Sequence, residues 1–82
     1  MKQEVTLLNY RDKDVKQRIR DRALNIIRER AIGTGRVVIE AGLHHATLRT
    51  FLNDTRDIAF VQLCKIENWV LEHEIDEVED GN

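Results

Sequence analysis

The segment between Thr34 and Leu52 constrains the fold of this chain more than any other part of it. Gly42 lies in its middle, and glycine adopts a positive φ at little steric cost, so this position suits a tight turn. The segment therefore predicts two short helices, at about 35–41 and 44–53, with Thr34 as the N-cap of the first. The apolar side chains expected to hold the two helices at a fixed angle are Val38, Ala41, Leu43, Leu48, Phe51 and Leu52.

A long helix is expected before this segment. Between about 11 and 31, apolar residues recur every three or four positions, which marks one buried helix face. Asn9 or Asp12 suits its start, and Gly33 lies where a C-terminal glycine is expected. The apolar positions are Val15, Ile19, Ala23, Ile26 and Ile27.

A fourth helix is expected after Asp57, which can cap it, and its pattern decays from Glu72 into a run of acidic residues. The chain has no proline and is rich in Leu, Ile, Arg, Glu and Ala, a composition that favours helices. Its 82 residues make one domain. We therefore expect an all-α protein, a compact bundle of four to five helices. Residues 1–10 would form a possible short extended arm, 11–72 the helical domain and 73–82 an acidic tail.

Cysteine usage and hydropathy indicate the compartment. Cys64 is the only cysteine, so no disulfide within the chain can stabilise the fold, and a single thiol fits a reducing compartment. Nothing at the N-terminus resembles a signal peptide, and the longest apolar runs are far too short to span a bilayer. We expect a soluble, cytoplasmic protein with no membrane contact.

The net charge of −2 hides a strong polarity along the chain. Residues 1–36 carry ten Lys and Arg against five acidic residues, whereas residues 57–82 carry one Lys against eight acidic residues. This polarity suits a protein that presents a basic face to an anion and keeps its acidic end away.

Polar side chains are expected on the outer face of helix 44–53. A short helix that follows a tight turn and presents polar side chains near its N-terminus has the geometry that reads the major groove of DNA. The outward residues expected on this helix are His44, His45, Thr47, Arg49, Thr50 and Asn53.

The segment 34–53 resembles the helix-turn-helix of the phage Cro/repressor family, also called lambda repressor-like. The turn glycine of that family falls on Gly42, and the apolar residue that follows it falls on Leu43. The core residues of the second motif helix fall on Leu48 and Phe51. The resemblance extends more loosely to about residues 15–72, because a long helix precedes the motif and another follows it.

Three positions depart from the family pattern. Val38 is larger than the small residue usual at the centre of the first motif helix. Thr34 stands where the family often has a glutamine that binds phosphate, and His44 stands where a serine or threonine often caps the second helix. The departures therefore concern one packing position and two helix N-termini.

The resemblance implies a sequence-specific transcriptional regulator, a phage or prophage-type repressor that binds a palindromic operator in double-stranded DNA. Arg49 is the best candidate for a base contact, because its guanidinium can donate two parallel bonds to guanine O6 and N7. Side chains at helix ends are better placed for the DNA backbone. The whole predicted DNA-binding set is Thr34, Arg36, His44, His45, Ala46, Thr47, Arg49, Thr50, Asn53 and Arg56.

A homodimer is expected because one recognition helix covers only a few base pairs, and two related by a twofold axis read half-sites about one helical turn apart. Trp69 suits a large core residue better, and a dimer contact is the alternative interpretation. The candidate interface residues, on the fourth helix and the N-terminal arm, are Phe60, Trp69, Val70, Val5 and Leu7.

The residue pattern argues against an enzyme and against a metal centre. The adjacent His44 and His45 point about 100° apart on a helix, so they rarely bind one ion together. Cys64 lies on an apolar helix and suits the core better than a ligand position. No set of nucleophile, base and acid appears, and we expect no cofactor and no small-molecule effector.

The alternative hypothesis is a protein-interaction module. In that case the helix-turn-helix is only a scaffold, and the acidic fourth helix and tail bind a basic partner or mimic DNA.

Overall fold

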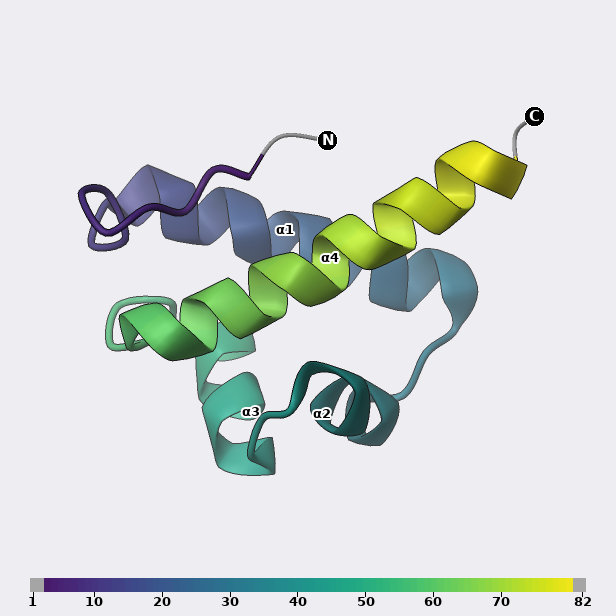
Figure 1. Cartoon of the computed structure of the whole chain (residues 1–82). Helices are drawn as coiled ribbons and strands as arrows, with labels where there is room; N and C mark the ends of the chain where they lie inside the picture. The colour runs from purple at the N-terminus through teal and green to yellow at the C-terminus, as the bar shows by residue number, and fades with distance from the viewer. Residues whose placement is uncertain (1–2, 81–82) are drawn as a thin grey trace.

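The computed structural model of this chain describes residues 3–80, with side chains described as far as Glu74. It contains four α-helices, which are α1 (Lys13–Arg30), α2 (Thr34–Ala41), α3 (His45–Asn53) and α4 (Phe60–Asp80) (Figure 1). Residues 3–80 contain no β-strand. The prediction of an all-α bundle is confirmed, with four helices.

Helix α1 begins and ends through local hydrogen bonds. The Asp12 carboxylate accepts from the backbone N–H of Asp14 at 2.8 Å and of Val15 at 3.3 Å, which confirms one of its two predicted caps. The helix ends at Ala31, which has a left-handed φ of 52°. The prediction of Gly33 as the terminating glycine is therefore wrong. Because the chain turns at Ala31, the next residue, Ile32, enters the core.

Helix α2 begins one residue earlier than predicted and ends at the predicted turn. Gly33 is its N-cap and Thr34 its first helical residue, so the prediction of Thr34 as the cap is wrong. Gly42 ends the helix with a φ of 73°, and its N–H donates to the Val38 carbonyl at 3.0 Å. The predicted glycine turn is confirmed.

Helix α4 differs from its prediction at both ends. It begins at Phe60, and the Leu63 N–H donates to the Ala59 carbonyl at 2.9 Å, so Asp57 is not its cap. Its backbone stays helical as far as Asp80, which corrects the prediction of a frayed tail starting at about residue 73. Residues 81–82 lie outside the described part of the chain.

The long helix α4 is the element around which the others pack. It crosses α1 obliquely and packs against it, and the α2–α3 pair lies beneath it in the view of Figure 1. The core between these helices contains most of the predicted face of α1, the motif residues Leu43, Leu48 and Phe51, and the inner face of α4. The other predicted motif residues, Val38, Ala41 and Leu52, are only partly buried, and Val37, which was not predicted, is the buried residue of α2. Its fully buried members include Ile19, Val37, Leu48, Phe51, Leu63, Ile66, Trp69 and Val70.

The N-terminal segment, residues 3–11, crosses from α4 to the start of α1. Residues 3–6 are irregular and residues 7–11 form a turn, so the possible extended arm contains no strand. Val5 is buried, and the N–H groups of Glu4 and Val5 donate to the carboxylate of Glu67, a residue with no exposed surface. This carboxylate therefore ties the N-terminal segment to α4.

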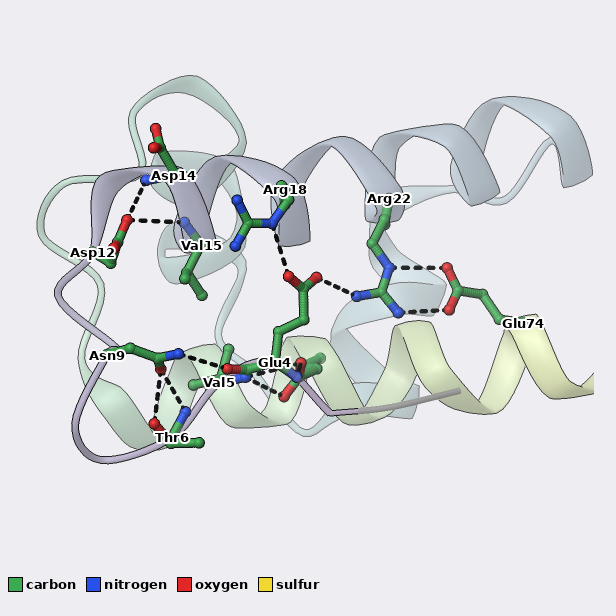
Figure 2. Close-up of polar contacts among 11 residues, drawn as sticks. Glu4, Val5, Thr6, Asn9, Asp12, Asp14, Val15, Arg18, Arg22 and Glu74 are labelled. Atoms are coloured by element: carbon green, nitrogen blue, oxygen red, sulfur yellow. Dashed lines mark hydrogen bonds and ion pairs between the residues drawn. The ribbon is translucent and has the colours of Figure 1, made fainter.

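The Glu4 side chain adds an ionic contact with α1. It pairs with Arg18 at 2.7 Å and with Arg22 at 2.8 Å, and the hydrogen bond from Arg18 and the two positive charges lower the pKa of Glu4 (Figure 2). Arg22 also makes a two-pronged contact with Glu74 of α4, at 2.6 and 3.0 Å.

These ion pairs change the meaning of the charge polarity. The basic helix α1 packs against the acidic helix α4, and Arg22 of the first pairs with Glu74 of the second. Among the described residues the basic and acidic parts of the chain are therefore partly paired, and the expectation of a basic face presented to an anion stays a prediction.

Candidate nucleic-acid interface

The outer face of α3 gathers most of the predicted contact residues. At about 100° of rotation per residue, His45, Arg49 and Asn53 follow one row, and Ala46 and Thr50 follow a second row beside it. All five residues are exposed, within an arc of about 140°. The opposite side of α3 carries the buried Leu48 and Phe51. Helix α3 is thus held by one face and presents the other to solvent.

Each of the two rows on α3 borders a different cleft. His45, Arg49 and Asn53 border a cleft of about 140 Å³, together with Thr34 from the start of α2. Leu48 and Leu52 also line this cleft. The structure therefore brings a predicted backbone-contact residue of α2 next to the predicted base-contact row of α3.

The second cleft lies on the other side of α3, against the loop before α4. It has a volume of about 350 Å³, and Thr47 and Thr50 line it together with the carboxylate residues Asp54 and Asp57. Thr47 is half-buried in this position. The acidic side of this cleft disfavours phosphate, so we expect the backbone contacts of α3 on the side of Arg49.

The N-termini of α2 and α3 have no side-chain caps. Neither Gly33 nor His44, the two N-cap residues, offers a side-chain hydrogen bond to the first turn. The first N–H groups of both helices are therefore open to an anion, and the helix dipole favours negative charge there. His44 occupies the predicted cap position of α3 but does not cap it, and its side chain is exposed.

The three arginines of the interface differ in their partners. Arg36 pairs with Glu40 at 3.0 Å, and Arg56 makes a two-pronged pair with Asp54, with contacts of 2.7 and 3.0 Å. The hydrogen bonds from Arg56 lower the pKa of Asp54 to about 2. Arg49 has no ion pair among residues 3–74, so its guanidinium is the most available of the three.

Glu40 links α2 to the core through Trp69. Its carboxylate accepts from the Trp69 indole N–H at 2.9 Å, and the His73 ring lies 3.5 Å away. The hydrogen bonds from Trp69 and Arg36 lower the pKa of Glu40. Sequence reasoning missed this residue, because the pairing depends on how α4 crosses α2.

The candidate dimer residues lie in different environments. Val5, Trp69 and Val70 are 3%, 2% and 0% exposed, so the chain's own core already covers these predicted contacts. Leu7 is exposed, and Phe60 is half-buried with its ring against Tyr10, at 5.2 Å between centroids. Of the five candidate dimer residues, only Leu7 and part of Phe60 are exposed and available to contact a second copy.

Two lysines were also missed by sequence reasoning. Lys16 is buried on α1, and Lys65 of α4 is half-buried. A signal existed for the first, since Lys16 lies three residues before Ile19 and therefore on the apolar face of its helix.

Within residues 3–74, no group of three or more His, Cys, Asp or Glu side chains converges as a metal ion would require. Burial raises the pKa of the Cys64 thiol. None of the described helices is both long enough and apolar enough to cross a lipid bilayer.

Comparisons of the chain with protein-family models, with characterised proteins and with solved structures find no match.

Proposed function

We propose that this chain is a sequence-specific DNA-binding regulator in which α3 enters the major groove. The observation that carries the proposal is the outer face of α3, where five adjacent side chains able to contact base edges are exposed on a helix fixed by its opposite face. The preceding turn at Gly42 brings the open N-terminus of α2 next to the same face. This is the arrangement by which helix-turn-helix proteins place one helix in the groove and another across the backbone.

The roles of the residues follow from their positions. Arg49 would donate two bonds to a guanine, Asn53 would bond to an adenine edge, and the Ala46 methyl would contact a thymine methyl. His45 and Thr50 flank these positions and complete the base-reading face. Thr34, Arg36, His44 and Arg56 would contact the sugar-phosphate backbone, whereas Thr47 is half-buried in the acidic cleft and would contribute least of the predicted set.

Such a regulator would act as a homodimer on a palindromic operator and would block transcription sterically, as a phage-type repressor does. One α3 covers only a few base pairs, so a second copy is needed for a site of useful length.

A salt titration of binding to random duplex DNA tests the proposal. On random duplex DNA Arg49 has no selected guanine partner, so it would lie against phosphate like Arg36 and Arg56. Three arginines would then neutralise about three phosphates, so the logarithm of the association constant should fall with the logarithm of salt concentration with a slope of about −3 per protomer. Absence of binding to any duplex at low salt would refute the proposal.

Arginine variants test the assignment of roles. Arg49→Ala should relax sequence choice at one position of a duplex selected from a random pool, at a cost of about 1–3 kcal/mol. Arg36→Ala should weaken binding to all sequences about equally. Arg28→Ala is a matched control, because Arg28 is exposed on α1 and has no ion pair among residues 3–74. Footprints with the reverse pattern would contradict the assigned roles.

The alternative of an acidic interaction helix receives less support from the described part of α4. Glu67 is buried and Glu74 is bound to Arg22, so Glu72 is the one exposed acidic side chain of α4 up to residue 74. If the chain binds a basic protein and binds no DNA duplex, that result would favour this alternative.

A further inference from the structure

Lysine side chains from the two long helices reach both loops that flank α3. The Nζ of Lys16, on α1, donates to the backbone carbonyl of Arg56 at 2.7 Å, in the loop after α3. The Nζ of Lys65, on α4, donates to the carbonyl of Gly42 at 3.2 Å, in the turn before α3. Each end of α3 is therefore tied to a different long helix.

The environment of Lys16 shows that its bond is a structural one. Only 6% of this residue is exposed, and its ammonium group makes no ion pair among residues 3–74. A buried charge is costly unless hydrogen bonds compensate it, and the Arg56 carbonyl supplies that compensation. Lys65 is half-buried and its bond is longer, so its restraint should be the weaker of the two.

We propose that Lys16 and Lys65 are positioning residues, which set the orientation of α3 relative to α1 and α4 by holding the two flanking loops. The consequence for DNA recognition rests on the proposed function. The restraint itself does not, because it consists of contacts within the free chain.

The need for such a restraint follows from the size of α3. This helix has nine residues, and its fully buried side chains are Leu48 and Phe51. Two apolar anchors fix its distance from the core better than its rotation about its own axis. Bonds to the carbonyls at both ends would restrict that rotation, and with it the direction in which Arg49 points.

Methionine variants separate the bond from the packing of the side chain. Lys16→Met and Lys65→Met keep an unbranched apolar stem and remove the donor. Lys13→Met removes the same charge from the exposed side of α1, where Lys13 has no side-chain hydrogen bond among residues 3–74. Lys16→Arg restores a donor at the buried position.

Amide hydrogen exchange of the free protein provides the direct readout. In Lys16→Met, exchange in α3 and the loop 54–59 should rise about tenfold, because a charge-assisted hydrogen bond is lost there. Lys65→Met should produce a smaller rise, centred on residues 42–47. The middle of α1 and of α4 should exchange as in the parent protein, and Lys13→Met should match the parent everywhere. Lys16→Arg should recover most of the protection.

Binding to a selected duplex gives a second readout. Both methionine variants should weaken binding by about three- to tenfold without changing the slope of affinity against salt, because neither lysine contacts phosphate. A slope reduced by about one would assign the lysine to the DNA backbone and overturn the proposal.

The exchange data also decide the proposal without DNA. An equal rise in all four helices would indicate a loss of global stability only, and no rise in α3 would show that the bonds do not restrain it. Either result overturns the positioning role. If the parent protein binds no duplex, the proposed function fails, while the exchange result still decides whether the lysines hold α3.

Discussion

The C-terminal ends of α1 and α2 have the same backbone conformation with different residues, which makes a reciprocal substitution informative. Ala31 has φ 52° and ψ 45°, and Gly42 has φ 73° and ψ 44°. In both cases the N–H of the next residue donates to a carbonyl five residues earlier, at 3.1 Å after α1 and 3.0 Å after α2. The two positions are therefore equivalent, except that one carries a Cβ atom in the left-handed region.

The expected magnitude combines two opposing effects. A Cβ atom in the left-handed conformation costs about 1–2 kcal/mol, whereas glycine loses more freedom on folding, which costs about 0.5–1 kcal/mol. Ala31→Gly should therefore raise the free energy of unfolding by about 0.5–1 kcal/mol, and Gly42→Ala should lower it by a similar amount. A Cβ at Gly42 meets no atom within 4 Å, so conformation alone sets the cost there.

Gly35→Ala is the matched control. Gly35 lies in α2 without a positive φ, and an added Cβ would make only an ordinary contact of 3.9 Å with the His45 ring. The variant should gain about 0.5–1 kcal/mol from helix propensity. Urea and thermal unfolding followed by circular dichroism measure all three variants, with about 4–8 °C of Tm expected per kcal/mol. A destabilised Ala31→Gly, or a Gly42→Ala variant as stable as Gly35→Ala, would refute this reasoning.

Three further predictions concern the buried carboxylate, one surface ion pair and the N-terminal segment. Glu67→Ala should lower the free energy of unfolding by about 3 kcal/mol, because it leaves a cavity and buried N–H groups without an acceptor; Glu67→Gln, which keeps an acceptor oxygen, should lose less in the same urea titration. Since Arg56 lowers the pKa of Asp54 from 3.8 to about 2, their pair stabilises the fold above pH 3.8 and is lost as the pH falls toward 2. Acid unfolding of Asp54→Asn should lack this component, and an unchanged profile would contradict it. Leu8→Ser should change Tm little, because Leu8 is 98% exposed, whereas Val5→Ala should cost about 1–3 kcal/mol. Equal losses in these two variants would show that Val5 is not a core residue.

The features that sequence alone could predict are those set by neighbouring residues. The turn at Gly42 follows from the conformational freedom of one residue, and the buried face of α1 follows from helical periodicity. The Asp12 cap acts over three residues. The exposed face of α3 was predictable for the same reason, because the apolar positions Leu48 and Phe51 fix which side of the helix turns inward.

The features that sequence could not predict depend on contacts between distant residues. Ala31 takes the left-handed conformation that Gly33 was expected to adopt, because the turn must deliver Ile32 to the core. Trp69 was compatible with a core position and with a dimer contact, and its bond to Glu40, 29 residues away, belongs to the core position. Nothing in the sequence around Glu67 indicated that its carboxylate would accept hydrogen bonds from the backbone N–H groups of Glu4 and Val5, at the other end of the chain.

The charge distribution along the sequence was a poor guide to the charge on the surface of the folded chain. The ion pairs that the structure shows sharpen the functional proposal. Because Arg18 and Arg22 pair with Glu4 and Glu74, α1 contributes less positive charge to any surface than its sequence indicates. The proposed interface must then rely on Arg49, on two arginines that would exchange carboxylates for phosphates, and on open N–H groups of two helices. Helix N-termini contribute only partial charges, so DNA binding should be less salt-dependent than for a protein with a continuous basic face. A slope much steeper than about −3 per protomer would mean that cations outside α2, α3 and their loops bind DNA, and that α1 does face the duplex.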